Sequence, residues 1–186
     1  TTIDEIAKHA DISRGSFYTY FPTKRDVLLA LGADSASQAE SFVQTFLDQA
    51  EPLTRQDMRR FVDGYFDLLE VHGAFATSWT QAALEDTHIR TAGMRRHLRM
   101  CEQFGRLVSE PDVEGDLVLR GLAAYCLIER SWGFAHLYGD DIDLDAFRDE
   151  VADMLYARHD GQEVRPARLA RLRGRALPRA ASGPAS

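Results

Sequence analysis

The sequence has only two cysteines among its 186 residues, and no apolar run approaches the roughly 18 residues that suggest a membrane-spanning helix. Cys101 and Cys126 lie within apolar helical patterns, so we expect two core thiols in a reducing cytoplasm rather than a disulfide framework. No signal-peptide pattern opens the chain at Thr1. These absences argue against a membrane protein and against a small disulfide-rich domain.

Motifs that carry enzyme chemistry are also missing. The chain contains no G-x-S-x-G elbow, H-E-x-x-H pair, Gly-rich phosphate loop or Cys-x-x-Cys, and its six histidines show no metal-ligand spacing. We therefore expect no catalytic residues, no metal and no cofactor. Two alternatives to a regulator stay open, an enzyme without these motifs and a helical adaptor protein, and a mobility-shift assay with DNA would separate them from a regulator.

The charge is unevenly distributed along the chain. The net charge of −7 at first argues against a nucleic-acid partner, but residues 1–31 are neutral and the arginine-rich segment 159–186 is positive. The acidic excess therefore lies in the middle of the chain. An acidic body with a neutral head is compatible with DNA binding by the head alone.

Apolar residues recur at helical spacing almost throughout, and sustained period-two alternation is absent, so the sequence predicts an all-α fold. We expect two short helices ending near His9 and Tyr20 and a longer helix from Lys24 to about Ala50. The next helix should end loosely at Gly73, and a further helical segment should cover 77–84. Two longer helices are expected over about 89–108 and 113–137, and a last helix should begin at Asp143. The segment 159–186, rich in Arg, Ala, Pro and Gly, is predicted to be a disordered tail.

Two short helices joined by the turn Ala10-Asp11-Ile12 are the skeleton of a helix-turn-helix. Thr2 and Ser13 are predicted to cap them. We expect Ile6, Ala7 and Ala10 to face Ile12 and Phe17 in the core of this head. Because Gly15 has no side chain, it should allow a close approach to the surface of the second helix. The predicted exposed side chains of that helix are Arg14, Ser16, Tyr18, Thr19 and Tyr20.

These residues resemble the DNA-binding head of the TetR (tetracycline-repressor-type) family over residues 1–31. The spacing T-x-x-x-I-A-x-x-A-x-I-S-x-G-x-F-Y-x-x-F-x-x-K-x-x-x-L runs without a gap from Thr2 to Leu28. Asp11 departs from the usual Gly of the turn, and Tyr20 replaces a common His. The resemblance also implies a further head helix before Thr1.

The resemblance implies that the second short helix reads double-stranded DNA. Arg14, Ser16 and Thr19 would then face bases, with Gly15 allowing close approach, while Thr2, Tyr18, Tyr20 and Lys24 would hold phosphates. The alternative is that Tyr18 is a core aromatic like Phe17 and Phe21, and that Arg14 is a solvated surface residue. Lys24, at the start of the next helix, is placed where an ammonium and backbone amides hold a phosphate together.

For the rest of the chain, the resemblance implies a cytoplasmic homodimer that binds a palindromic operator and responds to a small, largely apolar effector. We expect a DNA-binding domain over 1–31, a ligand-binding and dimerisation domain over 32–158, and dimer contacts from 113–137 and 143–157. Gly121, Ala124 and Cys126 would permit close approach of the partner. Repression relieved by ligand is the expected outcome, with activation as the alternative.

Aromatic side chains in the middle helices are the candidates for the effector pocket, although most aromatics at helical spacing are ordinary core. Glu129 either pairs with Arg130 on the surface or binds a polar group of the ligand. Gln81, Gln103 and His72 are weaker candidates. The predicted pocket residues are Phe61, Tyr65, Trp79, Phe104, Tyr125, Glu129 and Trp132.

Overall fold

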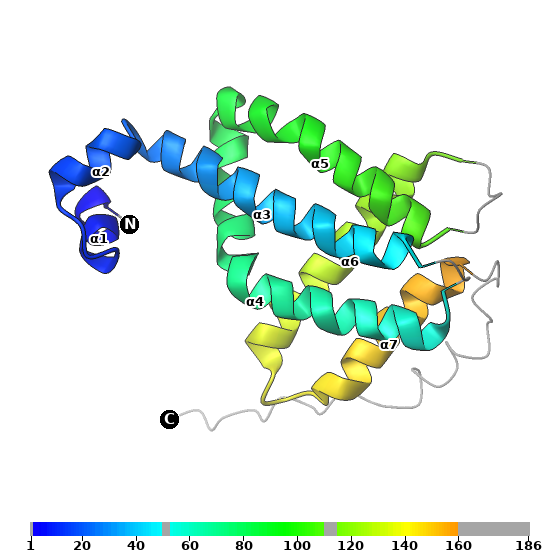
Figure 1. Ribbon diagram of the computed structural model, residues 1–186. Coiled ribbons are helices and arrows are strands. Elements are labelled where there is room, and N and C mark those ends of the chain that lie inside the picture. The colour runs from blue at the N-terminus through cyan, green and yellow to red at the C-terminus, as the bar shows by residue number, and fades with distance from the viewer. Residues whose placement is uncertain (1, 50–52, 110–114, 160–186) are drawn as a thin grey trace, which may run out of the picture.

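The computed structural model describes residues 2–49, 53–109 and 115–159, and these ranges hold seven α-helices and no strand (Figure 1). The all-α class is therefore confirmed. None of the helices in these ranges is long and apolar enough to cross a membrane. In chain order the helices are α1 (Ile3–His9), α2 (Arg14–Tyr20), α3 (Lys24–Leu47), α4 (Arg55–Glu85), α5 (Thr87–Leu107), α6 (Leu117–Tyr138) and α7 (Leu144–His159).

Capping boxes fix the starts of three helices. The hydroxyls of Thr2, Thr23 and Thr54 each accept a hydrogen bond from the backbone N–H three residues on, and the acidic side chain there accepts one from the threonine N–H. Each box satisfies two backbone donors that would otherwise lack partners. At the third box, hydrogen bonds from Thr54, and then Arg60, lower the pKa of Asp57 to about 2.

Helix α4 corrects one prediction from the sequence. It runs unbroken from Arg55 to Glu85, so Gly73 neither ends it nor separates a segment over 77–84. The ring of Trp132 on α6 lies so close to Gly73 that a Cβ there would come within 2.1 Å of it. Gly73 therefore serves the packing of α6 against α4 rather than a helix end.

The core is a cluster of aromatic rings between α3, α4 and α5. Phe61 and Phe104 are fully buried, with ring centroids 5.6 Å apart, and Tyr65 packs edge-on against Phe104 at 5.2 Å. Phe42 and Phe46 of α3 close the cluster. T-shaped and tilted ring pairs of this kind add stability beyond the area they bury.

Helices α5 and α6 approach each other through two glycines. A Cβ on Gly121 would lie 1.6 Å from the carbonyl oxygen of Cys101, and one on Gly105 would lie 1.9 Å from that of Leu117. Gly121 and the buried Ala124 therefore serve packing within one chain, not the approach of a partner that we expected.

Cys101 is buried as predicted, whereas Cys126 is exposed. Burial raises the pKa of the Cys101 thiol to about 11.

The last helix, α7, is held against α4 by apolar contacts and charge pairs. Val151, Ala152 and Leu155 are buried in the common core. At the rim, Arg59 of α4 lies 3.0 Å from Asp145 and 3.5 Å from Asp149. The predicted tail lies, apart from His159, outside the described residues.

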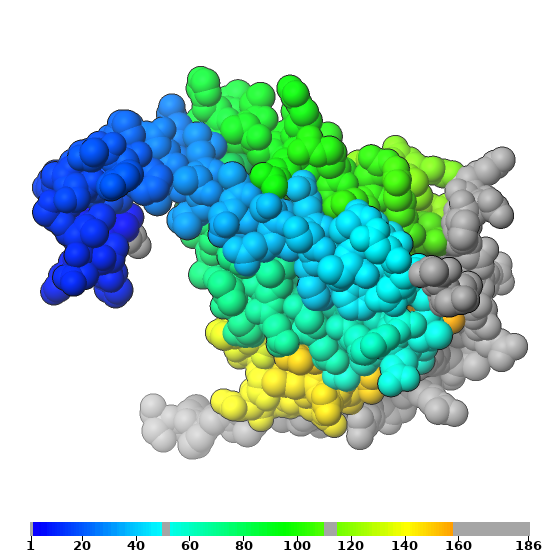
Figure 2. Space-filling model, in the orientation of Figure 1, coloured from blue at the N-terminus to red at the C-terminus, as the bar shows by residue number. Residues whose placement is uncertain are grey.

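Helix α3 joins the two parts of the molecule. It begins at Lys24, directly after the head, and its C-terminal half contributes Ala39 and Val43 to the core of the body. The expected boundary between head and body at residues 31 and 32 therefore falls inside one continuous helix. Figure 2 shows the head projecting from the body on this helix.

Candidate nucleic-acid interface and effector cavity

Helices α1 and α2 form a small head that packs mainly on itself. Its buried residues are Ala7, 4% exposed, and Phe17, 2% exposed, and the Phe17 ring lies 5.8 Å from that of Phe21. Ala10 and Ile12, which we expected in this core, are exposed, Ile12 by 41%. Within the described residues the head therefore has a narrow core, centred on Phe17.

The turn between the two helices depends on Asp11. Its φ of 53° lies in the left-handed region, where the family pattern usually has glycine. The Ile12 N–H donates to the Ala7 carbonyl at 3.0 Å and the Asp11 N–H to the Lys8 carbonyl at 3.3 Å. These two bonds form the Schellman arrangement that ends a helix and reverses the chain. Aspartate, which tolerates this conformation better than most residues, can replace glycine here.

Helix α2 presents its polar side chains to solvent and buries only Phe17. The Ser13 hydroxyl caps it by accepting from the Ser16 N–H at 3.0 Å. The Thr19 hydroxyl donates to the Gly15 carbonyl at 3.1 Å. Gly15 is exposed, and a Cβ there would meet only the Ser13 hydroxyl, at 3.7 Å. The helix is therefore capped at its start and has an accessible outer face.

Arg14 already has partners on the head itself. Its guanidinium lies 3.2 Å from the Asp4 carboxylate on α1 and 5.7 Å from the centre of the Tyr18 ring. The pKa of Arg14 is raised by a hydrogen bond with Tyr18 and by the charge of Asp4. An arginine that reads a base from this position has to leave Asp4.

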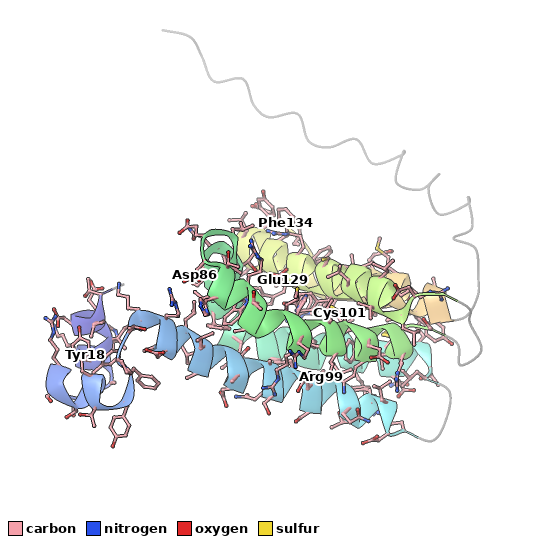
Figure 3. The ribbon with its side chains drawn as sticks, turned by 90° about the horizontal axis from the view of Figure 1, so that it is seen from above. Tyr18, Asp86, Arg99, Cys101, Glu129 and Phe134 are labelled. Atoms are coloured by element: carbon pink, nitrogen blue, oxygen red, sulfur yellow. The ribbon has the colours of Figure 1, made fainter. Side chains whose placement is uncertain are left out.

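The remaining head residues predicted to contact DNA lie at helix ends. Thr2 and Lys24 are exposed at the starts of α1 and α3, and Tyr20, 75% exposed, lies at the end of α2. Tyr18 is 40% exposed, and Figure 3 shows it within the head. Thr2, Tyr18 and Tyr20 belong to the small head, and Lys24 begins α3 directly after it.

A cavity of about 580 Å³ lies in the body between α3, α4, α5 and α6. Leu29, Gly32 and Ala36 of α3 form one wall of this cavity. Four of the predicted pocket residues, Tyr65, Trp79, Tyr125 and Glu129, line it, as does the weaker candidate His72.

Three predicted pocket residues lie elsewhere. Phe61 and Phe104 are fully buried within the aromatic core, where neighbouring rings cover them. Trp132 covers Gly73, and its indole N–H donates to Glu70 at 2.8 Å. Of the weaker candidates, Gln81 does not line the cavity, and Gln103 donates to Gln44 at 3.0 Å on the outer side of α3 and α5.

Two basic residues of the cavity were missed from the sequence. Arg96 of α5 binds the Glu40 carboxylate through two of its nitrogens, at 3.0 and 3.2 Å. His97 packs edge-on against the Tyr125 ring at 5.1 Å, and burial lowers its pKa. Neither residue carried a signal in the sequence that it would line a cavity, because the contacts of Arg96 and His97 depend on how α3 and α6 pack against α5.

Trp79 connects the cavity wall to the helix that carries the head. A Cβ on Gly32 of α3 would lie 2.6 Å from its indole ring, and one on Gly93 of α5 would lie 2.3 Å from it. The ring therefore fills the space between α3 and α5. Nearby, Arg25 in the first turn of α3 lies 2.7 Å from Asp86, which also caps α5.

Comparison with known proteins identifies the head. Residues 1–31 match the model of the family described as "Bacterial regulatory proteins, tetR family". BetI of Stenotrophomonas maltophilia, an HTH-type transcriptional regulator, is 28% identical over 154 residues, which cover 79% of this chain and 76% of that protein.

The head, residues 1–31, is that of the tetR family of bacterial regulatory proteins.

Other TetR-family relatives agree. EthR of Mycobacterium tuberculosis, also an HTH-type transcriptional regulator, is 36% identical over 74 residues, covering 39% of this chain and 34% of that protein. A solved structure of a protein with unknown function from Rhodococcus sp. RHA1 shares the fold, with a TM-score of 0.56 and 15% identity over 84% of this chain and 83% of that one. A tetR-type head and relatives named as transcriptional regulators support DNA-binding transcriptional regulation by this chain.

The ion pair between Arg14 and Asp4 yields a prediction for DNA binding. Asp4→Asn should strengthen binding to a specific DNA site about threefold, because the arginine no longer has to leave a carboxylate. The control is Asp11→Asn, which makes the same charge change in the turn and keeps a residue that tolerates positive φ. Fluorescence anisotropy with labelled DNA measures both affinities. Equal gains in the two variants would mean that only the net charge of the head matters.

Proposed function

We propose that this TetR-family regulator is a homodimeric repressor in the cytoplasm, released from a palindromic operator when a small, largely apolar ligand enters the cavity. One observation carries the proposal: helix α3 bears the head at its N-terminus and forms a wall of the cavity with Gly32 and Ala36. A ligand that moves this wall moves the head, because a continuous helix transmits displacement along its axis. Release requires that the ligand bind the two head positions with different affinities.

The geometry of α2 supports a recognition role in the major groove. We propose that Arg14, Ser16 and Thr19 contact base edges, where an arginine pairs best with guanine. Gly15 lets the backbone approach closely. Thr2, Tyr18, Tyr20 and Lys24 would hold phosphates on either side, fixing the register of the helix in the groove.

The outer face of α6 supports a dimer. Leu119, Phe134 and Leu137 are 63%, 44% and 67% exposed and follow one stripe of the helix together with Ala123, Cys126 and Arg130. Figure 3 shows Phe134 at the outer edge of the body. On α7, Met154 is also exposed, by 54%. An exposed stripe that is apolar apart from Arg130 is typical of a protein–protein interface, and a second copy would bring two heads to two half-sites.

The lining of the cavity supports a largely apolar ligand. Leu68, Phe75, Ala76 and Met100 contribute apolar walls, and a few polar groups lie among them. Cavities of this size, mostly apolar with a few polar groups, are typical of small-molecule sites. Because the DNA-binding head makes few contacts alone, a modest change in head spacing is enough to weaken operator binding.

Two head variants distinguish base reading from phosphate binding. Arg14→Ala should reduce discrimination between the operator and its single-base variants by about tenfold. Lys24→Ala should weaken all sites alike and lower the slope of log affinity against log salt by about 1 per chain. Gel-shift titrations on an operator selected from random DNA measure both effects and show whether two chains bind each operator. Unchanged affinity and sequence preference in Arg14→Ala would rule out its base-reading role.

Gly32→Ala tests whether the cavity wall controls the head. The added methyl would overlap the Trp79 ring, which Gly93 backs from the other side, so α3 has to move. We expect operator affinity to fall about tenfold, within the usual range of coupling between linked sites.

The control is the same change in a Trp79→Leu background, where the smaller side chain removes the overlap and should restore operator affinity. Circular dichroism establishes that each variant is folded. Wild-type operator affinity in Gly32→Ala alone, or failure of Trp79→Leu to restore it, would contradict a coupling through this wall.

A further inference from the structure

Glu129 places a carboxylate in the cavity without a charge partner. It lies on α6, is half-buried and lines the cavity, and Figure 3 shows it set back from the outer edge that Phe134 occupies. Among the described residues, neither a hydrogen bond nor an ion pair joins its carboxylate to another side chain. The surface pairing with Arg130 that the sequence allowed is therefore not formed.

The positive groups of the cavity do not neutralise this carboxylate. The charge of Arg96 is already paired with Glu40. Burial lowers the pKa of His97, an effect that Glu129 opposes but does not cancel, so the imidazole is neutral near pH 7. His72 hydrogen-bonds to Gln38 at 3.1 Å. The cavity therefore holds one uncompensated negative charge.

The effect of this charge extends to three helices. Burial, and then Glu129, raises the pKa of Tyr125 on the same helix, and Glu129 also contributes to the raised pKa of the buried Tyr65 on α4. With His97 on α5, the groups that this charge affects come from three helices and line the same cavity.

The walls of the cavity favour a cation of a particular kind. Tyr65, Phe75, Trp79 and Tyr125 line it, and the faces of aromatic rings attract ammonium groups, tryptophan most strongly. The rest of the wall is mainly apolar, so a small hydrated metal ion would lose its water without replacement. Among the described residues, no group of three or more metal-ligating side chains is present.

We propose that the cavity binds an organic monocation, an ammonium group carried on an apolar body, with the positive charge against Glu129. The inference rests on the proposed function, because it names the class of ligand for the same cavity. It adds that selectivity comes from one carboxylate, and that neutral molecules of the same shape bind less well.

A pair of probes of equal bulk tests the charge preference. We would titrate the full chain with (2-naphthylmethyl)trimethylammonium and with the neutral alcohol 2-naphthylmethanol, measuring affinity by calorimetry. The cation should bind about tenfold more tightly than the alcohol. Glu129→Gln should abolish that preference, because the affinity for the cation should fall about tenfold while the affinity for the alcohol should change by no more than about twofold.

The matched control is Glu85→Gln, which removes the same charge at an exposed position outside the cavity lining. It should retain the wild-type preference, which separates a local contact from the overall field of an acidic protein. Equal binding of the two probes to the wild type, or a preference that survives Glu129→Gln, would overturn the inference.

Operator release is read separately, by gel shift with the same probes. A cation that binds through Glu129 and leaves the operator complex intact would count against the proposed release and would support the ligand class. Release of the operator by the alcohol, with no preference for the cation in calorimetry, would support the proposed release and overturn the ligand class.

Discussion

The continuity of helix α3 is the constraint on which the rest of this structure depends. Its first turn follows the head directly, its middle forms a wall of the cavity, and its C-terminal half contributes Ala39 and Val43 to the core of the body. A helix of 24 residues is about 36 Å long, so it spans the whole distance from the head to the far end of the body. No break in the helix separates its middle, beside the cavity, from the end that carries the head.

The packing of the body explains why a cavity exists beside this helix. At one end of the body, Phe61 and Phe104 fill the space between α4 and α5. At the other end, Gly32 of α3 and Gly93 of α5 leave room for the Trp79 ring of α4, so the three helices pack around that one ring. The close approach of α5 to α6 at Gly105 and Gly121 fixes the remaining wall. Tight packing at these contacts therefore surrounds a space that the side chains of the chain itself do not fill.

Local signals in the sequence predicted the head well. Thr2 and Ser13 cap their helices, and Asp11 adopts the left-handed conformation that its place in the turn requires. The body was predicted less completely, because there the outcome depends on which helices meet. Tyr65 and Phe61 lie on the same face of α4, yet only Tyr65 reaches the cavity, and Gly73 was mistaken for a helix end because the ring that covers it comes from Trp132, far along the chain. Likewise, Glu129 and Arg130 are neighbours in sequence but point in different directions from α6.

Hydrogen–deuterium exchange, measured on the free chain and on its complex with operator DNA, tests the link between head and cavity most directly. If α3 connects the two sites, DNA binding must change amide exchange in the cavity wall, at residues 32–39 of α3 and in the facing segments 76–80 and 92–97, as well as in α1 and α2. The account predicts slower exchange in all of these segments. Protection confined to residues 2–31, with the cavity wall exchanging at its free rate, would contradict it.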